Sequence, residues 1–396
     1  MLEYDTVVVG AGPIGGYVAG KIAERKYKVI IFEKNKQIGT PVKCAGLVSP
    51  RVFDFLDIQK EEVVQNTLKG AHIHSPSGNI LTIGGNRVHA YAIDREKFDN
   101  EIIKKSKEKG AQVYLDNNVL SAQKINDHIE IFTSKKHEVK TKLVIGADGP
   151  HSIIRDRFIL PEPKEFLRGI GAEITNTNLD PDFVEIFVGE KIAPGFFAWI
   201  IPTNDKGTKA RIGLCTSHNI KESPKFYFQN FLKDKFSSKF FENIKIEKYI
   251  GGDIPLGSLK KTHTSNVLVV GDAAAQVKPT SGGGIYTGLL SASHCAKVAI
   301  DALQENNFSS QFLKKYHKLW YADIGLELFL GMRFRKIYKN LTDNQMDKYI
   351  KKFQNPKITE IISEYGDIDY PSKLVTPLLK KTPTLIRLIP SIIKEK

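Results

Sequence analysis

The order of apolar and polar residues predicts a βαβ unit at the beginning of the chain. Residues 4–9 (YDTVVV) and 28–33 (KVIIFE) are short and rich in β-branched residues, which is the pattern of buried parallel strands. Between them, apolar residues recur at helical spacing over residues 13–25. We therefore expect a helix with one apolar face, packed against two parallel strands.

A different pattern occupies residues 166 to 255. Segments such as DFVEIFVG, GFFAWIIP and ARIGLC are short, apolar and separated by turn residues, as in an antiparallel sheet. The first pattern returns at 266–272 (NVLVVGD) and leads into a long helical stretch from about 283 to 304. Before the change, residues 70–83 predict a hairpin and residues 95–109 a basic amphipathic helix.

These patterns predict an α/β chain (α+β overall) with a Rossmann-like nucleotide-binding domain into which an antiparallel sheet is inserted. We place the nucleotide-binding domain at 1–165 plus 256–305 and the sheet domain, expected to bind the substrate, at 166–255. Residues 306–396 are expected to form a helical C-terminal region with basic faces.

Three glycines at the first turn indicate where a nucleotide would bind. Gly10, Gly12 and Gly15 (GAGPIG) follow the first strand and open the helix, the context in which this spacing predicts dinucleotide binding. The first glycine permits the tight turn, the second lets a pyrophosphate approach the backbone, and the third lets the helix pack closely. Glu33 ends the second strand, where a carboxylate binds ribose hydroxyls and repels an extra ribose phosphate, which disfavours NADP in this site.

Later motifs indicate which dinucleotide it is. Two further strands end in a glycine that is followed within two residues by an aspartate, at 146–149 (GADG) and at residues 271–272, and glycines occupy 282–284. Asp272 is placed to accept hydrogen bonds from sugar or ribityl hydroxyls. The glycines leave room for a flat ring against backbone, and the helix that follows can stabilise negative charge on a reduced ring. A cofactor contacted from both ends of the chain must be long, which favours FAD.

Composition excludes several classes of protein. The net charge is +14, but the cations are spread over the whole chain, and no recognition module accompanies them, so we expect no nucleic-acid partner. Cys44, Cys215 and Cys295 have no metal-ligand spacing, which indicates a reducing compartment and predicts no metal site. We recognise no signal peptide and no spanning apolar run, and expect a cytoplasmic protein.

The motifs together resemble a known family. GAGPIGG, PVKCAG, the arginine of AIDREKFD, GADG and GDAAAQVKPTSGGG resemble motifs of the geranylgeranyl reductase family of flavoproteins, within the para-hydroxybenzoate hydroxylase-like fold. The resemblance covers residues 4–330, and PVKCAG is more selective than the first and last motifs. Archaeal members saturate the prenyl chains of di-ether phospholipids. The resemblance therefore implies an FAD-dependent reductase of geranylgeranyl chains, foremost those of archaeal-type ether phospholipids.

The resemblance also implies roles for individual residues. Those expected to contact FAD are Gly10, Gly12, Ile14, Gly15, Glu33, Cys44, Ala45, Leu47, Arg95, Val119, Asp272, Gly284 and Ile285. It places Cys44 beside the flavin and near the substrate double bond. Reducing an unactivated alkene needs a hydride and a proton, and a thiol can deliver or relay that proton. Cys44 is therefore the candidate catalytic residue; packing against the flavin is the alternative.

A second family pattern lies in the predicted sheet. Phe197, Trp199 and Pro202 (FAWIIP) match a motif that lines the prenyl cavity in the family, and Ile201 stands where the family often has Phe. Period-two alternation puts Phe197, Trp199 and Ile201 on one face of a strand. That face is expected to bind the substrate, with an ordinary sheet core as the alternative.

Other functions remain open on the same fold. A flavin-dependent monooxygenase or hydroxylase would oxidise its substrate, and a membrane-surface electron-transfer flavoprotein would yield no saturated product. For the reductase, the expected partners are a prenylated lipid and an electron donor, either NADPH or a ferredoxin-like protein. Because such a lipid resides in a bilayer and residues 377–396 interleave apolar with basic residues, we expect peripheral membrane association through this tail. Docking of the tail on the protein core is the alternative.

Overall fold

The structure is a computed structural model that describes residues 1–218 and 220–381. Its first large sheet contains the predicted βαβ unit, with β1 between β2 and β11 and all three strands parallel. The main path of this sheet has the order β17-β18-β11-β1-β2-β8. These strands are β1 (Leu2–Val9), β2 (Val29–Phe32), β8 (Gln112–Tyr114), β11 (Glu138–Gly146), β17 (His263–Thr264) and β18 (Val267–Val269).

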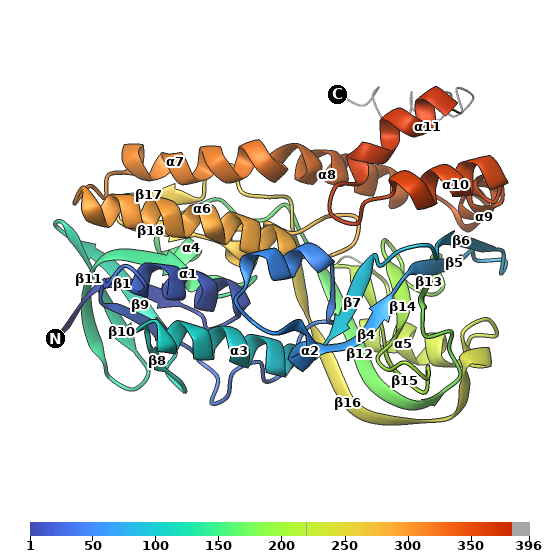
Figure 1. Ribbon diagram of the computed structural model, residues 1–396, viewed down its shortest axis with the longest axis horizontal. Helices are drawn as coiled ribbons and strands as arrows, with labels where there is room; N and C mark the ends of the chain where they lie inside the picture. The colour runs from blue at the N-terminus through green and yellow to red at the C-terminus, as the bar shows by residue number, and fades with distance from the viewer. Residues whose placement is uncertain (219, 382–396) are drawn as a thin grey trace.

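Helices cover one face of this sheet and a β-hairpin covers the other (Figure 1). Val8 of β1 belongs to a buried cluster with residues of the covering helices, whereas its neighbours Val7 and Val9 pack against the hairpin. A strand buried on both faces explains why the first segment is uniformly apolar. The covering elements are α1 (Pro13–Ala23), α3 (Arg95–Glu108), α6 (Ile285–Gln304) and α7 (Ser310–Trp320), and the hairpin strands β9 (Val119–Ile125) and β10 (His128–Thr133).

The second large sheet has seven strands in the order β16-β12-β15-β14-β13-β5-β6. The predicted hairpin at 70–83 forms β5 and β6, and β5 pairs in parallel with β13. A segment from the first part of the chain thus extends the sheet built by residues 165–256. Its strands are β5 (Gly70–His74), β6 (Ile80–Gly84), β12 (Glu165–Thr177), β13 (Phe183–Val188), β14 (Phe197–Pro202), β15 (Lys209–Ser217) and β16 (Phe241–Leu256).

Sequence patterning missed one helix beside this sheet, α5 (Pro224–Lys233). Ser223 caps its first turn and Pro224 begins it, while Phe228 and Phe231 bury against the sheet. Those start signals are visible in the sequence, but the helix lies within residues 166–255, where the sequence pattern otherwise predicts strands. It covers the face of the sheet opposite to the one that contains Trp199.

A small sheet connects the two large ones. Its order is β3-β7-β4, and β3 begins directly after the PVKCAG segment. This connection brings residues 44–48 next to residues 90–95, because Leu47 pairs with Ala92. The elements in this region are β3 (Leu47–Val48), the 3₁₀ helix η1 (Pro50–Phe55), α2 (Lys60–Val63), β4 (Val64–Leu68) and β7 (Ala90–Ile93).

The C-terminal part is helical as predicted and runs along the top of the molecule in Figure 1. No helix among the described residues is long and apolar enough to cross a membrane. The predicted interfacial tail at 377–396 falls mainly on residues 382–396, which lie outside the described residues. The remaining elements are α4 (Ile153–Arg157), η2 (Ser238–Phe240), η3 (Gly271–Ala274), η4 (Tyr321–Gly325), α8 (Leu326–Tyr338), α9 (Asp343–Phe353), α10 (Pro356–Tyr365), η5 (Pro371–Leu374) and α11 (Val375–Lys381).

Candidate active site

A cavity of about 930 Å³ extends between the first sheet, the small sheet and the seven-stranded sheet. It brings together most of the residues that the sequence nominated. Those of the cofactor set that line it are Gly12, Ile14, Glu33, Cys44, Ala45, Leu47, Arg95, Asp272, Gly284 and Ile285, and those of the substrate set are Phe197 and Trp199. Residues from nearly the whole length of the chain therefore share one site.

The glycines of the first turn have distinct roles. Gly10 has a φ of +101°, and a Cβ added there would lie 2.3 Å from the carbonyl oxygen of Ala147. A Cβ at Gly15 would lie 2.0 Å from the carbonyl oxygen of Gly10, whereas a Cβ at Gly12 would meet nothing within 4 Å. Gly10 and Gly15 are thus required by close backbone packing, and Gly12 leaves open space in the cavity before α1.

Glu33 is held rigidly at the end of β2. Its Oε2 accepts a hydrogen bond from the backbone N–H of Ala11 at 2.8 Å, and its Oε1 accepts one from Asn35 at 2.9 Å. Only 9% of the residue is exposed, and it lines the cavity. The carboxylate is therefore oriented beside the glycine turn, where the sequence predicted a ribose contact.

Asp148, within the GADG motif, has an unused oxygen. Its Oδ2 accepts a hydrogen bond from the N–H of Ile154 at 3.2 Å, but its buried Oδ1 has no partner among the described residues. Burial raises the pKa of this carboxyl group. A buried oxygen without a partner is costly, and because Asp148 lines the cavity, a ligand hydroxyl or water can satisfy it. Sequence reasoning used this motif but did not nominate this residue.

Asp272 begins the 3₁₀ turn after β18 and lies beside the start of α6. A Cβ at Gly284 would lie 3.0 Å from its Oδ1, so glycine is needed for this approach. Burial raises the pKa of Asp272 to about 6, against a smaller opposite effect of Arg95. A carboxylate in this position has a strong preference for hydrogen-bond donors from a ligand.

These features fit FAD. The space at Gly12 before the helix suits a pyrophosphate, and the carboxylate of Glu33, which lines the same cavity, would accept hydrogen bonds from ribose hydroxyls. Asp272 and the unpaired oxygen of Asp148 offer acceptors for further hydroxyls. The cofactor would therefore be held by backbone and carboxylates from both ends of the sequence, as expected for a long dinucleotide.

Cys44 lies between two hydrogen-bond donors. Its Sγ accepts the backbone N–H of Gly46 at 3.3 Å. The guanidinium of Arg95 binds Asp99 through two contacts of 2.9 and 3.0 Å. Burial lowers the pKa of Arg95, but Asp99 and then Cys44, through charge and hydrogen bonding, outweigh it and raise the pKa. Arg95 therefore stays charged next to the thiol.

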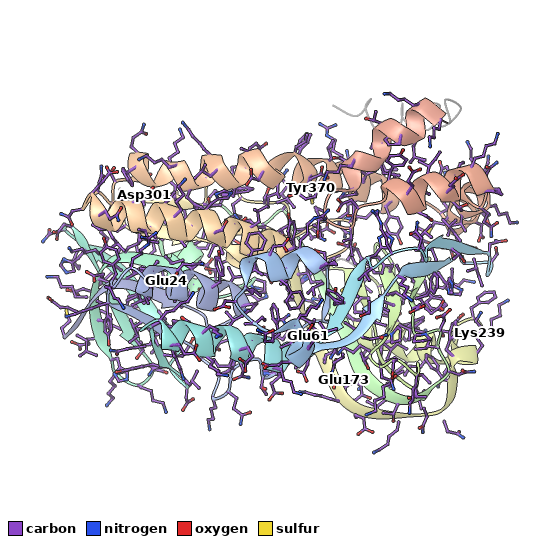
Figure 2. The ribbon with its side chains drawn as sticks, viewed as in Figure 1. Glu24, Glu61, Glu173, Lys239, Asp301 and Tyr370 are labelled. Atoms are coloured by element: carbon purple, nitrogen blue, oxygen red, sulfur yellow. The ribbon has the colours of Figure 1, made fainter. Side chains whose placement is uncertain are left out.

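Arg211, which sequence reasoning missed, holds the Cys44 segment in place. It is 3% exposed and donates to the carbonyls of Ala45 at 3.2 Å and Ile93 at 2.8 Å. It also donates to Gln65 at 2.6 Å and to Glu173, labelled in Figure 2, at 3.0 Å. Nothing in the sequence marks this arginine, because its partners come from four separate segments.

One face of β14 forms the apolar wall of the cavity. Phe197, Trp199 and Ile201 line it, whereas Ala198 and Ile200 point into the core on the other face. The predicted alternation is therefore confirmed. The indole N–H of Trp199 is buried and has no hydrogen-bond partner within the described part of the chain. An unpaired donor in an apolar wall is available to an atom of a bound ligand.

Four nominated residues are not among those that line the cavity: Gly10 and Gly15, which pack backbone against backbone, and Val119 and Pro202. Val119 is 2% exposed and packs in the core beneath β9, where its strand pairs with β10. Pro202 is buried at the end of β14, and its carbonyl accepts a hydrogen bond from Asn66 at 3.1 Å. The resemblance assigns Val119 a backbone contact with adenine and Pro202 a place in the prenyl cavity, and both assignments stay predictions.

A segment between α10 and η5 closes the cavity, and sequence reasoning did not foresee it. Asp367 accepts two hydrogen bonds of 2.8 Å from Arg51, and Asp369 accepts one of 2.7 Å from Lys278. Tyr370, labelled in Figure 2, bonds through its hydroxyl to Tyr286 at 2.8 Å. These contacts attach the C-terminal region to both loops that surround the predicted flavin site.

Comparisons with known proteins agree with this geometry. A model of the FAD-binding domain family matches residues 3–319. The chain is 31% identical over 392 residues to a digeranylgeranylglycerophospholipid reductase of Methanocaldococcus jannaschii, covering 97% of each protein. It is also 31% identical over 397 residues to a protein of the same name from Methanococcus vannielii, again covering 97% of each.

A solved structure has the same fold. A geranylgeranyl bacteriochlorophyll reductase-like protein from Thermoplasma acidophilum superposes with a TM-score of 0.86 at 25% identity, covering 99% of this chain and 100% of that protein. The predicted fold, a Rossmann-like FAD-binding part with an antiparallel sheet and a helical C-terminal region, is confirmed.

Proposed function

We propose a reaction for this chain from the premise that it belongs to the geranylgeranyl reductase family of flavoproteins, as its family match and its relatives show. It is a flavin-dependent oxidoreductase, and its cofactor is FAD. The proposed reaction is the saturation of carbon–carbon double bonds in geranylgeranyl chains, foremost those of archaeal-type ether phospholipids.

The observation that carries this proposal is the continuity of the cavity. One space connects Gly12 and Glu33 of the cofactor side with the apolar wall at Phe197 and Trp199. FAD, when bound, supplies the hydride for such a reaction. The apolar side chains of the sheet favour a hydrocarbon chain and exclude water from the reacting carbons.

We assign the role of proton donor to Cys44. Saturating one double bond adds a hydride to one carbon and a proton to the other, and the S–H bond of Cys44 breaks to supply that proton. The resulting thiolate keeps the N–H of Gly46 and the guanidinium of Arg95 as neighbours. Cys215 also lines the cavity, but burial raises its pKa to about 12, which makes it a poor proton donor at neutral pH.

The proposed substrate and reaction imply two partners, a membrane surface and an electron donor. A prenylated phospholipid resides in a bilayer, so we propose that the protein works at the membrane surface from the cytoplasmic side. Part of the contact is assigned to the tail at 377–396, of which 377–381 is described as the end of α11. Electrons are proposed to come from NADPH or a ferredoxin-like protein.

Product analysis tests the proposed function. Chemically reduced holoprotein is incubated without oxygen with digeranylgeranylglyceryl phospholipid, and the lipid is examined by mass spectrometry. We expect lipid that has gained two hydrogens per saturated double bond, and about 100-fold slower formation by Cys44→Ser with FAD retained, because a general acid contributes at least that much. A lipid that stays unchanged without oxygen, but gains oxygen atoms when air is admitted, would contradict the reductase proposal and indicate a monooxygenase.

A further inference from the structure

Helices α7 and α8 form one long rod along the surface, joined by the π-helical turn η4 (Figure 1). Their buried residues Tyr316, Trp320, Ile324 and Leu328 belong to one core cluster. Because these positions all face the core, the opposite sides of α7 and α8 together form one outer surface.

The α8 part of this surface is apolar, although it faces away from the core. Leu326 is 63% exposed, Phe329 46% and Phe334 37%. An amphipathic surface helix normally carries charged residues on its outer side. Three large apolar side chains within nine residues therefore form a patch that needs an explanation, unlike a single exposed residue.

The same surface is basic. Arg333 stacks its guanidinium on the ring of Phe329 at 5.1 Å, and α7 presents Lys314, Lys315 and Lys318 outward. Two acids occur in this stretch, and both are engaged: Asp323 with His294 at 2.6 Å, and Glu327 with Ser372, whose backbone N–H it accepts at 3.2 Å. The outer surface thus combines exposed apolar side chains with exposed basic ones.

The apolar patch lies next to the wall of the cavity. Ser372, which binds Glu327 of α8, belongs to η5, and the η5 residues Pro371 and Leu374 line the cavity. On its inner side, α8 packs Gly331 against Pro279 of the flavin-side loop, with only 2.8 Å between a Cβ at this glycine and the proline ring. One helix therefore separates the cavity from the patch.

We propose that the outer surface of α7 and α8, with Leu326, Phe329 and Phe334 at its centre, binds the surface of an anionic bilayer. The apolar side chains enter the interfacial layer, and the lysines of α7 contact anionic head groups. The docked protein presents the η5 side of the cavity to the layer in which a prenylated lipid resides. This inference rests on the proposed function only for the identity of that lipid.

Vesicle flotation of the full-length holoprotein tests the surface. The probes are vesicles of phosphatidylcholine alone and of phosphatidylcholine with phosphatidylglycerol. We expect binding to the anionic vesicles that weakens with salt. Leu326→Glu with Phe329→Glu is expected to reduce binding at least about tenfold, since two apolar groups no longer enter the interface and two negative charges face the lipid.

A matched control changes two other exposed apolar residues. Leu2→Glu with Ile159→Glu alters charge equally, at positions that are 45% and 92% exposed on the first sheet and after α4, and should leave binding within about twofold of wild type. Equal flotation of wild type and the α8 variant would overturn the proposal. A large fall in melting temperature for the α8 variant alone would also overturn it. So would light scattering that shows a dimer for wild type and a monomer for the variant. Either result would mean that the patch contacts protein and not lipid.

The reductase proposal can fail separately. With lipid dispersed in detergent, the α8 variant should saturate double bonds at the wild-type rate, while losing activity on lipid embedded in vesicles. Vesicle binding by a wild-type protein that saturates no lipid in either form would contradict the proposed function and retain the docking surface.

Discussion

The two walls of the cavity differ in the atoms they present. The cofactor side consists of backbone, glycines and carboxylates such as Glu33 and Asp272, each fixed by close packing or hydrogen bonds. The seven-stranded sheet presents large apolar side chains, foremost Phe197 and Trp199. The first wall suits a ligand rich in phosphate and hydroxyl groups, and the second suits a hydrocarbon chain.

This difference shows how each wall tolerates change. Where backbone packs against backbone there is no room for a methyl group, as the 2.0 Å approach at Gly15 illustrates, so substitution at such a position should be all-or-none. Apolar contacts are many and individually weak, so substitution there should have graded effects. The Cys44 segment lies between the walls and depends on both.

The largest effect is expected at Gly15. Gly15→Ala forces a Cβ against the carbonyl of Gly10 and should destabilise the fold by about 3 kcal/mol and abolish FAD binding. Gly12→Ala is the matched control, because its Cβ meets no protein atom within 4 Å; it should fold normally and only weaken FAD binding. Thermal melts and flavin titration measure both. Equal behaviour of the two variants would contradict the packing argument.

A smaller and selective effect is expected on the apolar wall. Trp199→Ala should raise KM for the prenyl lipid roughly 30-fold, equivalent to about 2 kcal/mol of lost apolar contact, with FAD binding unchanged. Tyr249→Ala, an aromatic on β16 that is 66% exposed, serves as the control in the same sheet. Loss of flavin from the Trp199 variant would show that the two walls are not separable.

The Cys44 segment, which lies between the two walls, is tested by substitution of Arg211. Arg211→Met keeps the length of the side chain but leaves the carbonyls of Ala45 and Ile93 without their donor. We expect kcat to fall about tenfold with KM unchanged, because Cys44 loses its position, and we expect the thiol to react faster with a maleimide. Arg211→Lys should restore part of the rate. Arg168→Met, at an exposed position on the neighbouring strand, should do neither.

The smallest effect concerns the pH dependence of the flavin-free protein. Burial raises the pKa of Asp272 from its ordinary value of 3.8 to about 6 in the folded protein, so the folded state holds the proton more tightly. Its contribution to stability is full below pH about 4 and is lost as the pH rises through about 6. Asp272→Asn should therefore be more stable than wild type by about 1–3 kcal/mol at pH 7.5, with no gain at pH 4, and should bind FAD less tightly. A pH-independent difference in denaturant melts would exclude this cause.

The same contrast explains what the sequence could predict. Glycine spacing and acids at strand ends depend on backbone geometry within short segments. The positions of Gly10, Gly12, Gly15 and Glu33 at the first turn and the end of β2 could therefore be predicted from the sequence. The alternation of cavity-facing and core-facing residues on β14 could be predicted for the same reason. Contacts between distant segments were not: Arg211 joins four of them, and Asp367 reaches Arg51 across most of the chain.

Val119 stays a prediction. The family resemblance assigns its backbone to a hydrogen bond with adenine, and the structure places its side chain in the core at the start of β9. A buried side chain is compatible with a contact made by the backbone. The helix α5 was missed because its neighbours are strands, so that a local start signal was outweighed by its context.

Anaerobic single turnover tests the central claim most directly, namely that the two walls act on one flavin and one prenyl chain. Reduced holoprotein is mixed with geranylgeranyl lipid without oxygen, and flavin absorbance and lipid mass are followed together. The account predicts reoxidation of the flavin that depends on the lipid, with one double bond saturated per flavin, and much slower reoxidation in Cys44→Ser. A flavin that stays reduced with the lipid and reoxidises only when oxygen enters would contradict it.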